Sequence, residues 1–192
     1  MKQTAARHLV DALLMNGVTH VFCVPGESYL AVLDALYDVR DRIKLIACRH
    51  EAAASNMAEA FGKLTGRPGV VMVTRGPGAT QGAVGLHTAF QDSTPMILFI
   101  GQVARDQLDR GACQELDYRR MFSSVVKWAG QIDVPARAGE YVNRAFATAM
   151  NGRPGPVVLA LPEDMLTEEV AAESLPPAPV AKAAPDERAL ET

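Results

Sequence analysis

The sequence has few cysteines and histidines and no long hydrophobic run. Its three cysteines, Cys23, Cys48 and Cys113, show neither metal-ligand nor disulfide-framework spacing, which predicts reduced thiols in a cytoplasmic protein. The four histidines are scattered, so no metal site is expected on this chain. The longest apolar stretches, "PMILFIG" and "PVVLALP", fall well short of the ~20 residues that a membrane span needs. These absences argue against a disulfide scaffold, a metalloprotein and a membrane protein.

A strong charge of either sign is also missing. The chain of 192 residues has 19 Lys and Arg against 22 Asp and Glu, a net charge of −3, and no dense basic cluster. Nucleic acid and anionic membranes are therefore not expected as partners. Nearly half of the residues (48%) are hydrophobic, which suits a globular core. The N-terminal stretch "MKQTAARHLVDALLMNG" is amphipathic and predicts a helix over about 3–16, not an export signal.

Short apolar segments alternate with helix-like segments along the first 165 residues or so. Helices are expected over about 3–16 and 28–39, with Leu30, Leu33 and Leu36 facing inward in the second. The predicted strands are "HVFCV", "KLIA", "VVMVT", "PMILFIG", "SVVKWA" and "VVLALP". Strands that are apolar throughout and separated by helices indicate a parallel sheet covered on both faces. The predicted fold class is α/β: a doubly wound, six-stranded, mostly parallel sheet with helices on both faces.

The composition changes after residue 168. The stretch "AAESLPPAPVAKAAP" is rich in Ala and Pro, which is typical of a linker. The final "DERALET" resembles a helix start, with Asp186 as a plausible cap. We therefore expect a domain over 1–168, and over 169–192 a linker and the start of an absent central domain of a longer protein.

Glu51 marks the point where an apolar run, "IKLIA", gives way to an alanine-rich helix. The run is expected to be a buried strand, and Ala54, Met57, Ala58 and Phe61 form the helix's apolar stripe. One explanation is a first-turn acid that favours the helix. The other is a functional carboxylate, because ligands in doubly wound folds bind beyond the carboxyl ends of the strands. The loops "VPGES", "CRHEA", "TRGPGATQG" and "GQVARD" all leave such ends, which favours the second explanation.

The glycine-rich segment "RGPGATQG" is expected to be a loop that opens a helix. A phosphate cradle is one interpretation, but Gly76, Gly78 and Gly82 give GxGxxxG where the dinucleotide fingerprint needs GxGxxG. A tight turn that admits a partner surface is the other interpretation. A serine hydrolase is not expected, because no GxSxG element is present.

Several motifs, taken together, resemble a known family. These motifs are "VFCVPGESYLAVLDAL", "RHEAAASNMAEAFGKLTGRPGVVMVTRGPGATQG", "AFQDSTPMILFIGQV", "CQELD" and "GRPGPVVLALPEDM". In their order and spacing they resemble the N-terminal pyrimidine-binding domain of thiamine-diphosphate enzymes, in the acetolactate synthase and 2-oxoacid decarboxylase group. The resemblance covers about residues 3 to 168. Three departures weaken the narrower expectation of acetolactate synthesis: Glu27 stands where many synthases have a second glycine, Gln81 where they have Asn, and Cys113 where they have Phe.

The resemblance implies a role for Glu51. It matches the glutamate that contacts N1′ of the cofactor's aminopyrimidine, where a shared proton favours the 4′-imino tautomer that removes the thiazolium C2 proton. Gln114 matches a glutamine near the reacting substrate. The positions implied to bind the cofactor are Val24, Pro25, Gly26, Glu51, Thr74, Pro77 and Gln81.

The resemblance also implies partners. The active site would be shared with a second copy of the chain, and a small 2-oxoacid would be the substrate. The diphosphate and its Mg²⁺ would be held by another domain's "GDG…N" element, which this sequence lacks, so the chain alone is expected to be inactive. FAD is left open, since it would depend on the central domain. The alternative is a stand-alone regulatory or binding domain that kept the fold without catalysis.

Overall fold

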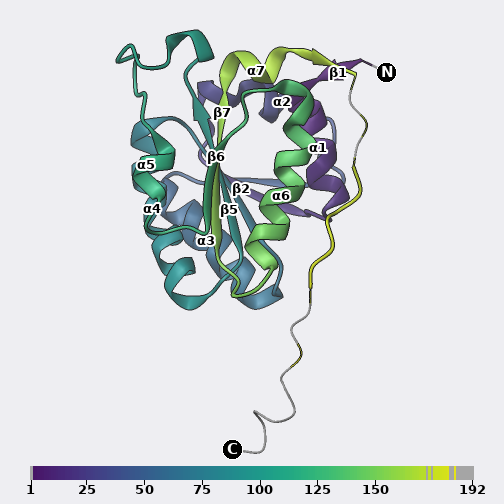
Figure 1. The fold of residues 1–192 in the computed structure, drawn as a ribbon, viewed down its shortest axis with the longest axis vertical. Coiled ribbons are helices and arrows are strands. Elements are labelled where there is room, and N and C mark those ends of the chain that lie inside the picture. The colour runs from purple at the N-terminus through teal and green to yellow at the C-terminus, as the bar shows by residue number, and fades with distance from the viewer. Residues whose placement is uncertain (1, 172, 174, 182–183, 185–192) are drawn as a thin grey trace, which may run out of the picture.

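The computed structural model describes residues 2–171, 173, 175–181 and 184, and these contain a six-stranded sheet of order β3-β2-β4-β5-β7-β6 (Figure 1). Every neighbouring pair in this sheet is parallel. The strands are β2 (His20–Cys23), β3 (Lys44–Ala47), β4 (Gly69–Val73), β5 (Met96–Gln102), β6 (Trp128–Gln131) and β7 (Pro156–Pro162). The predicted doubly wound α/β fold is confirmed.

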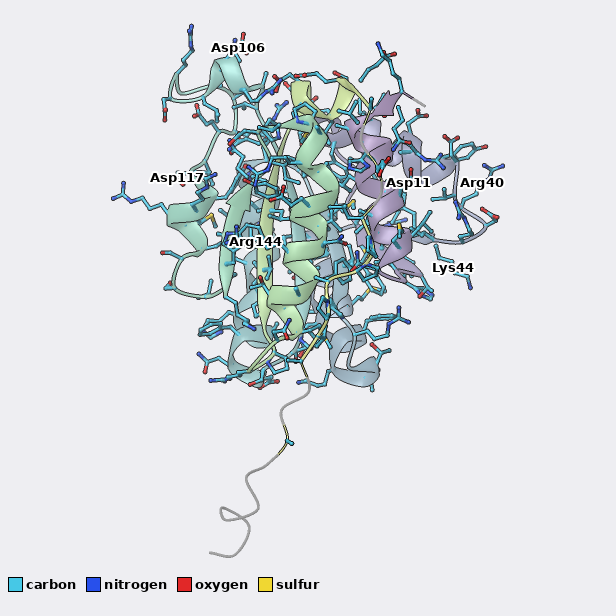
Figure 2. All side chains as sticks on the ribbon, turned by 45° about the vertical axis from the view of Figure 1, so that its right-hand side comes forward. Asp11, Arg40, Lys44, Asp106, Asp117 and Arg144 are labelled. Atoms are coloured by element: carbon cyan, nitrogen blue, oxygen red, sulfur yellow. The ribbon has the colours of Figure 1, made fainter. Side chains whose placement is uncertain are left out.

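Helices cover both faces of this sheet, and each face has its own hydrophobic cluster (Figure 1). One face is covered by α1 (Ala5–Met15), α2 (Leu30–Tyr37) and α6 (Ala138–Met150). The other is covered by α3 (Glu51–Thr65), α4 (Gly76–Asp92) and the short α5 (Tyr118–Phe122). Figure 2 shows Asp11 of α1 and Arg144 of α6 on the same side of the sheet. Strands β4, β5 and β7 are buried along their whole length, as a sheet covered on both faces requires.

The edge strand β3 differs from the prediction of a buried strand. Lys44, Leu45 and Ala47 are exposed and Ile46 is only partly covered. Because β3 pairs only with β2 among the described strands, it lies at the end of the sheet, where the helices cover it less completely. An apolar strand at an edge therefore keeps exposed side chains.

Two predicted inward-facing side chains are also exposed. Leu30 is 61% exposed, because the chain enters α2 through a 3₁₀ turn, η1 (Glu27–Tyr29), and α2 buries Val32 and Leu36 instead. Met57 is 41% exposed, because α3 packs through its small residues. These are corrections to the predicted helix faces.

The glycine-rich segment was predicted to be a loop that opens a helix, but α4 already begins at Gly76. Only Thr74 and Arg75 separate it from β4. The predicted strand "SVVKWA" begins only at Trp128. Other short elements were not predicted: the 3₁₀ turns η2 (Arg105–Gln107) and η3 (Pro135–Arg137) and the helix α7 (Glu163–Thr167).

The two ends of the domain pair with each other. β1 (Gln3–Thr4) forms an antiparallel pair with β8 (Glu169–Val170), so residues 169 and 170, which the sequence prediction placed in the linker, contact the domain. Residues 175–181 then run along α6, where Asn143 Nδ2 donates to the carbonyl of Leu175. This segment leads away from the carboxyl edge of the sheet, which is the upper edge in Figure 1. The predicted helix start "DERALET" lies outside the described residues.

Candidate cofactor site

The order of the strands places a topological switch point at the carboxyl edge of the sheet, and we call this part of the edge the crevice. From β2 the chain moves outward to β3, and it then returns to place β4 on the other side of β2. The strand order therefore reverses between β2 and β4, and ligands of doubly wound folds bind at such a switch point. Residues 24–26 directly follow β2 at this edge, and Thr74 directly follows β4.

Glu51 is the first residue of α3 and lies at this crevice. His50 precedes it as the N-cap, and His50 Nδ1 accepts a hydrogen bond from Ala52 N at 3.1 Å. Within the described residues, no hydrogen bond or ion pair engages the Glu51 carboxylate. A Cβ added to Gly78 would lie 3.4 Å from Glu51 Oε1, so the carboxylate faces a glycine in the first turn of α4. The result is a half-buried carboxylate that no side chain of the described residues pairs with.

The segment after β2 packs tightly against the end of β4. A Cβ on Gly26 would come within 2.5 Å of Thr74 Cβ, so only glycine permits this approach. Ser28 Oγ and Thr74 Oγ1 are hydrogen bonded at 2.9 Å. The Tyr29 hydroxyl donates to the carbonyl of Val24. Burial, and to a smaller degree Cys23 and Glu51, raise the pKa of Tyr29, so this phenol stays neutral and remains a donor.

Gln114 lies against the start of α4. Its backbone is in the left-handed region (φ 64°), and its carbonyl accepts a hydrogen bond from Gly76 N at 2.9 Å. Gln114 and Pro77 line one cavity of about 410 Å³, together with Thr80 and Leu116. The structure thus brings Gln114 to the glycine-rich segment, whereas Gln81 is exposed one turn further along α4.

A cavity of about 650 Å³ lies elsewhere. It is at the carboxyl ends of β5, β6 and β7, lined in part by Gln102, Tyr118 and Gln131. Over the part of the chain that the structure describes, no group of His, Cys, Asp and Glu is arranged to hold a metal ion. No helix in the described ranges is long and apolar enough to cross a membrane.

Comparison with known proteins decides the family. Residues 3–121 match the family described as thiamine pyrophosphate enzyme, N-terminal TPP binding domain. The chain belongs to this family. Thiamine pyrophosphate (TPP) is the same compound as thiamine diphosphate.

Relatives of this TPP-binding domain are much longer. An acetolactate synthase catalytic subunit from Aspergillus candidus is 40% identical over 155 residues, which cover 81% of this chain and 22% of the relative. An acetolactate synthase of Bacillus subtilis is 39% identical over 168 residues (88% and 29%). The isozyme 3 large subunit of acetolactate synthase from Escherichia coli is 40% identical over 163 residues (85% and 28%). The chain therefore spans less than a third of these relatives.

The candidate site of this TPP-binding domain contains residues that the sequence analysis did not identify. Ser28 and Tyr29 brace the segment after β2, and Arg75 is a buried arginine next to Thr74. The sequence did contain one signal for Arg75, since it is a charged residue between an apolar strand and a glycine-rich helix start. Its partner Glu163 is 88 residues away in the sequence, and no local pattern predicts that pair.

Proposed function

We propose that this chain is the N-terminal cofactor-binding domain of a thiamine-diphosphate-dependent enzyme that acts on 2-oxoacids. The reaction is an acetolactate synthase-like decarboxylation followed by carboligation. The observation that carries the proposal is the unpaired Glu51 carboxylate, which faces Gly78 in the crevice between β2 and β4. Residues 1–168 form the domain, and 169–192 lead toward a central domain.

The residues at the crevice fit a flat heterocycle. Gly78 leaves room beside the carboxylate, since a Cβ there would already contact Glu51 Oε1 and Thr74 Cγ2. The backbone of Val24, Pro25 and Gly26, with Thr74 packed against Gly26, would form one wall of the ring's site, and Pro77, at the start of α4, would border it. When bound, thiamine diphosphate supplies an ylid that acts as an electron sink.

In this proposal Glu51 acts as a general acid and base. Its carboxyl group holds the proton at N1′ of the aminopyrimidine and takes it back during the reaction. Glutamine at this position would keep a hydrogen bond but could not exchange a proton. Gln114, whose carbonyl accepts a hydrogen bond from Gly76 N at the start of α4, would face the substrate, and Gln81 lies further along that helix.

The remaining parts of the site come from outside this domain. A separate diphosphate domain holds the Mg²⁺ and the diphosphate, and a second copy of the chain completes the active site. The partial coverage of the acetolactate synthases is consistent with this division. The substrate is a small 2-oxoacid, with pyruvate as the first compound to test.

The test is Glu51→Gln in the complete protein, with Glu140→Gln, an exposed position on α6, as the matched control. We expect the Glu51 variant to lose roughly 10²–10⁴-fold of its thiamine-diphosphate-dependent pyruvate consumption. Exchange of the cofactor's C2 proton, followed by NMR, should fall in parallel, while the control keeps both. Unchanged turnover in the Glu51 variant would refute the role given to this residue. Cofactor binding without turnover in the unmodified protein would favour a binding domain.

A further inference from the structure

Arg75 joins three segments at the carboxyl edge of the sheet. It lies between β4 and α4 and is only 8% exposed. Its Nη1 donates to Glu27 Oε1 at 3.3 Å, and its Nη2 donates to Glu163. Glu27 belongs to the segment after β2, and Glu163 is the first residue of α7, directly after β7. One guanidinium therefore connects the ends of β2, β4 and β7.

The two carboxylates hold Arg75 unequally. The Glu27 side chain is 75% exposed, whereas that of Glu163 is 40% exposed. Among the described residues, Arg75 Nε is buried without a hydrogen-bond partner. A buried charge is costly unless its partners remain in place. Arg75 thus depends on both acids, and Glu163 is the better-shielded anchor.

The segment after β2 is held to the β4–α4 junction through adjacent residues. Gly26 lies against Thr74, and Ser28 is hydrogen bonded to Thr74 Oγ1. In the sequence, Glu27 lies between Gly26 and Ser28. It forms an ion pair with Arg75, the residue after Thr74. The ion pair between Glu27 and Arg75 therefore holds the residue that directly follows Val24, Pro25 and Gly26, the proposed wall of the cofactor site.

We propose that Arg75 is a positioning residue: through Glu27 it holds Val24, Pro25 and Gly26 in the shape that receives the cofactor's aminopyrimidine. Glu163 anchors Arg75 to α7. The inference rests on the proposed function. It gives Glu27 a role in positioning. Many synthases have a second glycine at this position, and a glycine could not form the ion pair with Arg75.

The test compares three variants of the complete protein: Arg75→Met, Glu27→Ala and Arg153→Met. Arg153 is the control, because it also ties two segments, by bonds to Ser93 and Gln91, but away from the crevice. The measurements are the Kd for thiamine diphosphate by calorimetric titration and the Tm without cofactor. We expect Arg75→Met to raise Kd at least tenfold and Glu27→Ala to raise it several-fold. Arg153→Met should lower Tm and leave Kd unchanged.

The double variant Arg75→Met/Glu27→Ala separates positioning from a general loss of stability. If both residues act through the same tie, its Kd should match that of Arg75→Met alone. If Arg75→Met does not fold, Glu27→Ala decides, because that side chain is mostly exposed. Wild-type Kd in Glu27→Ala would then overturn the inference, as would wild-type Kd in a folded Arg75→Met. Absence of any cofactor binding by the unmodified protein would instead refute the proposed function.

Discussion

Gly78 controls the space in front of the Glu51 carboxylate. In Gly78→Ala, the new methyl group would lie 3.4 Å from Glu51 Oε1 and 3.0 Å from Thr74 Cγ2. The fold should tolerate this change, because alanine favours a helix by about 1 kcal/mol over glycine and offsets the tight contact. Cofactor binding should not tolerate it, since the methyl group would press on the Glu51 carboxylate and on Thr74, two residues of the proposed site. We expect the Kd of the complete protein for thiamine diphosphate to rise roughly tenfold or more, about 1.4 kcal/mol.

Gly82→Ala is the control for this prediction. Gly82 is on the same helix, but its added Cβ would make ordinary contacts of 3.7 Å with Val73 Cγ1 and 3.9 Å with Leu98 Cδ2. This variant should gain up to about 1 kcal/mol of stability and keep its Kd. Equal affinities in Gly78→Ala and Gly82→Ala would show that the ring does not lie beside Gly78.

At the residue scale, the sequence pattern correctly predicted that a helix begins at Glu51, whereas it gave no indication of the partners of Arg75. Glu51 follows a strand-like run and begins a clear helix pattern, and α3 does begin there. The Arg75 network depends on partners 48 and 88 residues away, so only the fold brings them together. The left-handed backbone of Gln114 likewise has no local signal, since it is neither glycine nor asparagine.

At the scale of elements, the approach of α4 to α3 fixes how Glu51 faces Gly78. The two helices meet where Gly85 N donates to Ser55 Oγ at 3.2 Å. A Cβ on Gly85 would lie 2.6 Å from the backbone carbon of Ser55, so Gly85→Ala must push the helices apart. We expect a loss of about 1–3 kcal/mol or more in the free energy of unfolding, measured by urea denaturation. Gly82→Ala, one turn away, should not lose stability; an equal loss in both would refute this account.

The predicted elements were most accurate where the chain is most buried. Strands β4, β5 and β7 are apolar throughout because helices cover both of their faces, and the sequence pattern identified each of them. It misjudged β3, whose apolar residues lie at an edge. It also missed the pairing of β1 with β8, because two-residue strands far apart in the sequence have no periodicity to detect.

At the scale of the whole molecule, the domain contains the proposed cofactor crevice, and no group of His, Cys, Asp and Glu within the described residues is arranged to hold a metal ion. Residues 1–192 alone should therefore bind thiamine diphosphate weakly, without dependence on Mg²⁺, and should not turn over pyruvate. Calorimetric titration with and without Mg²⁺, beside the complete protein, measures this. Tight, Mg²⁺-dependent binding to the isolated chain would contradict a divided site.

The stability of the whole domain should also depend on pH through His8. This histidine is on α1, is 2% exposed and faces Gly139 of α6, and its Nδ1 has no hydrogen-bond partner among the described residues. Burial lowers its pKa below the usual 6.5, and the nearby Asp11 offsets this only in part. The folded state therefore binds a proton less readily than the unfolded chain. The contribution of His8 is complete above pH 6.5 and is lost as the pH falls below it.

Each tenfold difference in proton affinity between the two states is worth about 1.4 kcal/mol. Urea unfolding of the domain at pH 7.5 and 5.5 should thus show lower stability at the lower pH. His8→Gln removes the titrating ring and should flatten this dependence, whereas His87→Gln, at an exposed position on α4, should leave it unchanged. If His8→Gln kept the full pH dependence, the acid sensitivity would have to come from groups other than the buried imidazole.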